Sequence, residues 1–188
     1  MKNKWLIILG IPLAIVLLVA VWYIGTYNSL IRLNEEVSNK WSQVETQYQR
    51  RVDLIPNLVS TVKGAGSFES STLEEITRLR SQWQSSGSVE QKVSTANQIE
   101  SALSKLLVVA ENYPQLKATQ NYLSLQDELA NTENKVAVER GRYNEAVRNF
   151  NARIKTFPSN IVAGKLGYSD REYFKSKEGA QNAPEVKF

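Results

Sequence analysis

An uncharged N-terminal stretch constrains this chain more than any other feature of its sequence. No charged residue occurs from Trp5 to Ile31, and the segment 5–24 is apolar except at Gly10 and Pro12. A helix of about twenty residues rises about 30 Å, which matches the hydrocarbon layer of a bilayer. The stretch therefore predicts a transmembrane anchor over residues 5–27. The positions that we assign to this anchor, with aromatic residues at both ends, are Trp5, Leu9, Ile15, Leu18, Trp22 and Tyr23.

Two other interpretations of this stretch are weaker. A secretory signal peptide has an apolar region of roughly 7–15 residues followed by a small-residue cleavage site. Here the apolar run is longer, and Ala20-Val21-Trp22 is a poor cleavage site. The length also argues against a buried helix of a soluble core. The orientation is nearly balanced, with Lys2 and Lys4 on one flank and basic residues on the other, and we expect the N-terminus in the cytoplasm and the domain outside.

The composition excludes several classes of function. The chain contains no Cys and no His, so it lacks a thiolate nucleophile, a Ser-His-Asp triad and the usual zinc ligands. Two of its four net positive charges come from Lys2 and Lys4, which leaves too weak a field for nucleic-acid binding. We therefore expect no catalytic activity, no cofactor, no metal, no nucleic-acid partner and no small-molecule substrate.

The remainder of the chain shows helical periodicity and no strand pattern. Large apolar residues recur every seven positions in two long segments, which is typical of helices that pack along a seam. The fold class predicted is all-α, with the anchor helix continuous with an elongated, coiled-coil-like antiparallel bundle of long helices. The predicted seam residues are Trp41, Tyr48 and Ile55 in the first segment, and Tyr122, Leu129, Val136, Tyr143, Phe150 and Phe157 in the second.

Turn and capping signals place the remaining boundaries. Pro56 either kinks the first long helix or lies in the first turn of a new helix capped by Asp53. Ser71 and Ser88 have capping-box spacing and predict two shorter helices, and Pro114 begins a helix that runs to about residue 156. The predicted organisation is a flank at 1–4, the anchor at 5–27, the bundle at 28–157, and a tail at 158–188 with a short helix near Ser169.

Polar residues interrupt both seams at one level. Arg51 stands where the first seam calls for an aliphatic residue, and Glu133 lies in the polar part of the second segment. Two antiparallel helices would bring these residues to the same height. We therefore predict that Arg51 and Glu133 form a buried polar pair that fixes the helix register.

Several motifs resemble the LemA family. They are Tyr-Asn-Ser-Leu at 27–30, Trp-Ser-Gln-Val at 41–44, Arg-Arg-Val-Asp-Leu-Ile-Pro-Asn-Leu-Val at 50–59, Tyr-Pro-Gln-Leu-Lys-Ala at 113–118, Leu-Ala-Asn-Thr-Glu-Asn at 129–134 and Phe-Pro-Ser-Asn at 157–160. The resemblance implies a bacterial, membrane-anchored protein with an antiparallel bundle of long helices. It implies no catalytic residue.

Three hypotheses for function follow. The first is a non-catalytic scaffold in the bacterial inner membrane that self-associates at the cell envelope as a homo-oligomer, since long seams often bury area between subunits. The second is an extracytoplasmic binding module that docks a partner membrane protein or an envelope component. The third is an enzyme, or a subunit of one, that uses carboxylates.

Overall fold

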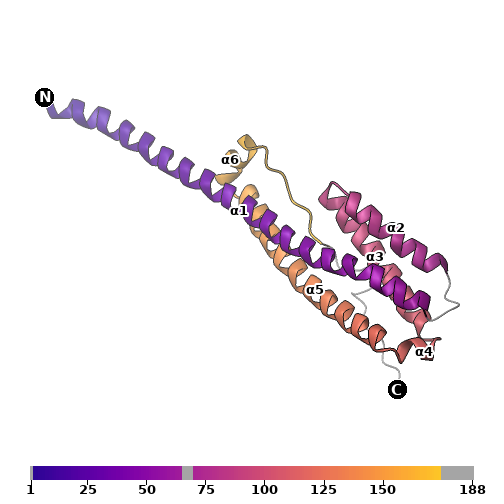
Figure 1. Cartoon of the computed structure of the whole chain (residues 1–188). Helices are drawn as coiled ribbons and strands as arrows, with labels where there is room; N and C mark the ends of the chain where they lie inside the picture. Colours follow the sequence, from indigo (N-terminus) through magenta and orange to yellow (C-terminus); the bar gives the residue numbers. More distant parts are fainter. Residues whose placement is uncertain (1, 65–69, 175–188) are drawn as a thin grey trace, which may run out of the picture. The chain divides into compact units, whose positions relative to one another are not determined.

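The protein is built from helices alone in its described part. The computed structural model describes residues 2–64 and 70–174, while residues 1, 65–69 and 175–188 and the side chains of 2–8 and 70 lie outside the description. This part forms six helices and no strand (Figure 1), which confirms the all-α class. They are α1 (Lys2–Gly64), α2 (Ser70–Ser85), α3 (Val89–Ala110), α4 (Pro114–Lys117), α5 (Gln120–Lys155) and α6 (Ser159–Lys165).

The chain divides into two compact units. Unit 1 comprises Met1–Ser42 and Glu139–Phe188, and unit 2 comprises Gln43–Val138. Helices α1 and α5 contribute to both units, whereas α2, α3 and α4 belong to unit 2 and α6 belongs to unit 1. In each unit a part of α5 runs back beside a part of α1 (Figure 1).

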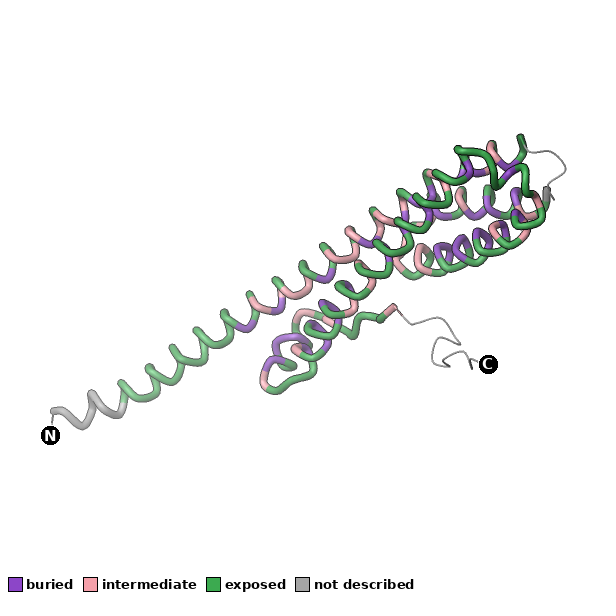
Figure 2. Tube along the Cα trace, turned by 90° about the horizontal axis from the view of Figure 1, so that it is seen from below, coloured by how far each residue is buried: buried purple, intermediate pink, exposed green. Residues whose placement is uncertain are grey.

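Helix α1 changes character along its length within unit 1. Every described side chain from Leu9 to Gly25 is exposed, and burial begins at Thr26 and Leu30 (Figure 2). An exposed apolar surface of this kind is unfavourable in water. Among the described residues, α1 is the one helix that is long and apolar enough to cross a membrane.

Helix α1 is continuous through Pro56. It runs from Lys2 to Gly64, so the alternative in which a new helix begins at Asp53 is wrong. The carboxylate of Asp53 instead accepts a hydrogen bond of 2.8 Å from the side-chain amide of Gln49, one turn earlier. Pro56 is exposed, so its ring points away from the buried seam.

Unit 2 buries the apolar stripe of α2 against its neighbours. Leu73, Ile76, Leu79 and Trp83 are all buried, and α2 packs on α3. The Trp83 ring lies 5.3 Å from that of Tyr48 on α1, and its indole N–H donates to the side-chain oxygen of Gln49 at 3.2 Å. Such a buried aromatic pair with a satisfied indole fixes how α2 sits on α1.

Hydroxyl side chains cap the N-termini of α3 and α5. The Ser88 hydroxyl accepts a hydrogen bond from the amide of Gln91 at 3.2 Å and so caps α3. The helix predicted from Pro114 to about residue 156 is interrupted, because α4 ends at Lys117 and α5 begins at Gln120. The break lies at Thr119, whose hydroxyl accepts from the amide of Tyr122 at 3.4 Å and caps the new helix.

The last described residues of unit 1, 168–174, form an extended segment that we call the strap. Gly167 has φ +69, and its amide and that of Tyr168 bond back to the carbonyls of Gly164 and Ala163, the pattern of a Schellman motif. This motif ends α6 and turns the chain around. The short helix predicted near Ser169 is therefore wrong, and the short helix of the tail is α6 instead.

Most predicted seam positions are buried. Trp41 is half-buried, while the buried ones are Tyr48, Ile55, Tyr122, Leu129, Val136, Tyr143 and Phe150. Phe157 needs correction, because its side chain is 76% exposed. Helix α5 ends at Lys155, so residue 157 lies in the following turn and no longer keeps the helical period. Ile154 is the last buried apolar residue of this helix.

Candidate functional site

Arg51 is the most deeply buried charged residue of unit 2. It lies on α1 between the buried seam positions, and only 2% of its surface is exposed. Its Nη2 atom is 3.6 Å from a carboxylate oxygen of Glu133 on α5. The Glu133 side chain is 57% exposed, so the pair is buried at the arginine end only. The prediction that both partners are buried is therefore wrong for Glu133, whose side chain lies on the exposed side of α5.

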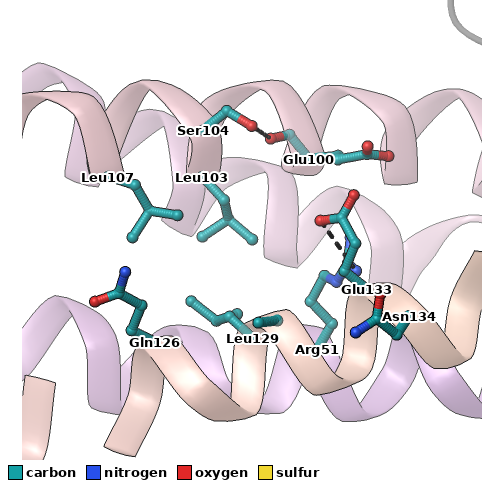
Figure 3. Close-up of a pocket in the computed structure, with 10 residues that line it drawn as sticks. Arg51, Glu100, Leu103, Ser104, Leu107, Gln126, Leu129, Glu133 and Asn134 are labelled. Atoms are coloured by element: carbon teal, nitrogen blue, oxygen red, sulfur yellow. Dashed lines mark hydrogen bonds and ion pairs between the residues drawn. The ribbon is translucent and has the colours of Figure 1, made fainter. Parts of the chain in front are cut away.

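Arg51 and Glu133 line a pocket in unit 2 (Figure 3). The pocket has a volume of about 290 Å³ and lies between α1, α3 and α5. Its polar and apolar lining is mixed, which is usual for binding sites. Besides the ion pair, the lining consists of Glu100, Leu103, Ser104 and Leu107 from α3, and Gln126, Leu129, Ala130 and Asn134 from α5.

The pocket can bind a polar group more readily than it can perform acid–base chemistry. Within the described structure, the Nη2 atom of Arg51 is buried and has no hydrogen-bond partner, since the contact with Glu133 is too long for one. A buried donor in this state is costly, and an acceptor atom entering the pocket would relieve the cost. The hydroxyl of Ser104 donates to the backbone carbonyl of Glu100 at 2.9 Å, so it is not aligned with a base.

No metal centre accompanies this pocket. In the described ranges, no group of three or more His, Cys, Asp or Glu residues is placed to hold a metal ion. The acidic lining residues are Glu100, which is 5% exposed, and Glu133. The pocket is therefore lined by one basic and two acidic side chains. It lies where the sequence analysis places polar residues within the apolar seams.

Two asparagines of unit 1, Asn144 and Asn151, were not anticipated from the sequence. Each uses both ends of its amide to hold the strap's main chain. Asn151 accepts from the Arg171 amide at 2.9 Å and donates to its carbonyl at 2.8 Å. Asn144 accepts from the Phe174 amide at 2.9 Å and donates to its carbonyl at 3.0 Å. These bonds satisfy the main chain of the strap without a helix or a sheet.

The spacing of the two asparagines explains why they fit an extended chain. Residues seven apart on a helix are separated by about 10.5 Å along its axis. Three residues of an extended chain span about 10 Å, so Asn144 and Asn151 match the positions of Arg171 and Phe174. Asparagines at heptad spacing beside a seam are the sequence signal that points to such a clamp.

Aromatic contacts complete the strap's attachment. The Phe174 ring stacks on Trp41 with centroids 5.9 Å apart and meets Tyr143 edge-on at 5.3 Å. The guanidinium of Arg140 lies 5.3 Å from the centre of the same ring. Trp41 is thus a docking surface for the strap as well as a seam residue, and it is half-buried with the strap in place.

The anchor positions lie on the exposed part of α1. The side chain of Trp5 is outside the described part of the structure. Leu9, Ile15 and Leu18 are each more than half exposed, and Trp22 and Tyr23 are each 38% exposed. This part of the chain therefore presents apolar side chains outward with aromatic residues near its end, as a membrane-spanning helix does.

Comparison with known proteins gives the family. A model of the LemA family matches residues 40–188. Protein LemA of Metamycoplasma hominis is 32% identical over 158 residues, which are 83% of this chain and 72% of that protein. Magnetosome protein MamQ 2 of Paramagnetospirillum magneticum is 25% identical over 177 residues, or 80% of this chain and 65% of the relative, somewhat under two thirds of its length. Magnetosome protein MamQ of Magnetospirillum gryphiswaldense is 24% identical over 195 residues, which are 88% and 72%. None of these names carries a catalytic function, and the chain belongs to the LemA family.

Proposed function

We propose that this protein is a non-catalytic helical scaffold, anchored in the bacterial inner membrane by α1, that self-associates at the cell envelope. The observation that carries the proposal is the continuity of α1, which passes from exposed apolar residues at 9–25 into a packed helix from Thr26 onward. A helix of this kind ties a folded domain to a bilayer without a flexible linker.

Outward-facing apolar side chains support self-association. Val108 is 65% exposed on α3, and Val138 is 53% exposed on α5. Apolar residues on the outside of helices are a common source of contact between identical subunits. Two of the relatives are named as magnetosome proteins, that is, as parts of a larger structure, and this supports the proposal of a structural role.

Light scattering of the full-length protein in mild detergent tests self-association. The expected mass, corrected for bound detergent, is a multiple of the 21.2 kDa chain. Val108→Glu should shift the mass toward the monomer, whereas Gln98→Glu, at an exposed polar position of the same helix, should leave it unchanged. A monomer for the unaltered protein at all accessible concentrations would refute the scaffold.

The proposed orientation places the bundle outside the cytoplasm. The chain has no cysteine, so a single Asp127→Cys variant carries one thiol at an exposed position of unit 2. A maleimide that cannot cross the inner membrane should label this thiol in cells whose outer layers have been made permeable while the inner membrane stays intact. Labelling only after the inner membrane is disrupted would reverse the orientation.

A binding module is the second candidate, and Arg51 favours it. Its buried Nη2 atom offers a hydrogen bond into the pocket, as a site for a carboxylate or phosphate oxygen of a partner does. Acetate and inorganic phosphate should then raise the melting temperature of the protein more than chloride does at equal ionic strength. Arg51→Met should abolish that difference, and equal effects of the three anions would exclude an anion site here.

A further inference from the structure

The turn between α5 and α6 exposes large apolar side chains. Phe157, in the turn, is 76% exposed, and Ile161, on α6, is 54% exposed. The opposite side of α6 is packed, since Val162 and Ala163 are buried. Helix α6 therefore has one side packed on unit 1, while its other side exposes Ile161 together with Asn160, Gly164 and Lys165. We call Phe157 and Ile161 the α6 surface.

The α6 surface lies beside the end of the apolar stretch of α1. The ammonium group of Lys165 is 6.0 Å from the centre of the Tyr23 ring. Tyr23 lies near the end of the proposed membrane span, residues 5–27, and the first buried residue in the described part of α1 is Thr26. Figure 1 shows α6 near α1, and Figure 2 shows where burial begins along α1. The packed part of unit 1 therefore starts at the level where the bilayer would end.

The charge around the turn suits an anionic lipid surface. From Ala146 to Ser169 the sequence carries basic residues and no acidic one. Arg148 lies within 3.9 Å of Glu145, and Lys155 pairs with Asp170 at 2.6 Å, while Lys165 sits over the Tyr23 ring. Aromatic rings, aliphatic side chains and lysines together are the composition that membrane interfaces favour.

We propose that the α5–α6 turn is a second membrane contact of this protein. Phe157 and Ile161 enter the boundary between head groups and acyl chains, and Lys165 lies at the level of the lipid phosphates. The occupant of the α6 surface is thus lipid, because the anchor holds this surface at the bilayer whenever α1 spans it. The inference rests on the proposed membrane anchoring. It adds a second contact, which would fix how the packed part of unit 1 is rotated about the axis of the anchor helix.

Spin labels on single cysteines test this contact in the full-length protein. The labels are placed at Phe157→Cys and Ile161→Cys, with Leu18→Cys as the lipid control and Glu145→Cys as the aqueous control in unit 1. The protein is reconstituted in vesicles of phosphatidylethanolamine and phosphatidylglycerol. Accessibility is measured to oxygen, which concentrates in lipid, and to a nickel chelate, which stays in water.

The expected ratio of oxygen to nickel accessibility at positions 157 and 161 is several-fold higher than at 145 and approaches the value at 18. A ratio equal to that at 145, with a lipid-like value at 18, refutes the second contact and leaves the anchor intact. Low accessibility to both agents at 157 and 161 means that another copy covers the α6 surface, which also refutes the proposal. A water-like value at 18 overturns the anchor and the contact together.

A charge variant provides an independent check. Replacing phosphatidylglycerol by phosphatidylcholine should lower the ratio at position 161, because the attraction of Lys165 to anionic head groups is lost. In a Lys165→Gln background the same exchange of lipids should change the ratio less. An identical response in both backgrounds would show that Lys165 does not face the lipid phosphates.

Discussion

The ion pair of Arg51 and Glu133 gives the sharpest test of how unit 2 is stabilised. The two residues differ greatly in exposure, since the arginine side chain is 3% exposed and the glutamate side chain is 57% exposed. Removing the glutamate leaves the buried guanidinium without its ion-pair partner on α5. Removing the arginine leaves an acid that water already solvates. We therefore expect Glu133→Gln to cost more stability than Arg51→Met, although the arginine is the buried partner.

The magnitude follows from the separation of 3.6 Å between the charged groups. Coulomb's law gives about 1 kcal/mol at the dielectric constant of water and about 5 kcal/mol at an effective value near 20. The exposure of Glu133 brings the interaction toward the lower figure, so we expect a coupling of about 1–2 kcal/mol. Arg51→Met forfeits this coupling but also removes a buried donor without a partner, and its net effect should stay within about 1 kcal/mol.

A double-mutant cycle measures this coupling directly. Urea unfolding of the full-length protein in mild detergent, followed by circular dichroism, gives the free energy of unfolding for both single variants and the double variant. Glu133→Gln should cost about 1–2 kcal/mol in the wild-type background and close to nothing in the Arg51→Met background. Glu128→Gln, at an exposed acid of the same helix, is the control. Equal costs of Glu133→Gln in both backgrounds, or a loss above about 3 kcal/mol for Arg51→Met, would refute the reasoning.

Three further predictions concern other contacts. Asn151→Ala should speed hydrogen exchange of the Arg171 amide and cost about 1–2 kcal/mol, since two hydrogen bonds to the strap are lost; unchanged exchange in mass spectrometry would contradict the clamp. Burial, aided by Glu111, raises the pKa of Tyr122 above its usual 10.0. Above that pH the unfolded chain releases the proton first, so stability falls as pH rises, and Tyr122→Phe should flatten this fall in pH-dependent urea titrations. Ser88→Ala removes the cap of α3 and should lower stability by about 1 kcal/mol, measurable as a shift in the urea midpoint.

Local signals in the sequence sufficed for α2, for α3 and for one long-range proximity. The stripe of α2 and the cap at Ser88 depend on neighbours within one or two turns, so periodicity and capping rules find them. The closeness of Arg51 to Glu133 was within reach because two antiparallel helices of known rise fix which levels meet. The unequal exposure of the two side chains could not be predicted, because residue spacing along a helix does not determine how far other helices cover each side chain.

Two parts of the structure differ from the sequence-based predictions, each for its own physical reason. Phe157 keeps the seven-residue spacing, yet α5 ends two residues before it and the spacing loses its meaning. The segment after Ser169 has a capping pattern, but Asn144 and Asn151 bind the main-chain groups of residues 171 and 174 that a helix would use internally. At the strap, partners distant in sequence override the local preference, whereas at Phe157 the helix ends before the seven-residue period does.

The polar side chains of this bundle serve mainly to position main chain and rings. Gln49 accepts from the Trp83 indole, and Lys92 forms an ion pair with Glu45 inside unit 2. A side chain that is held in this way contributes to a fixed arrangement of helices and has little freedom to bind or transfer a proton to a substrate. Arg51 differs, because one of its buried nitrogen atoms faces a pocket with hydrogen-bonding capacity left over. The choice between a scaffold and a binding module therefore depends on Arg51: if acetate and phosphate leave stability unchanged and Arg51→Met is tolerated, the residue serves packing, and the scaffold is the better account of unit 2.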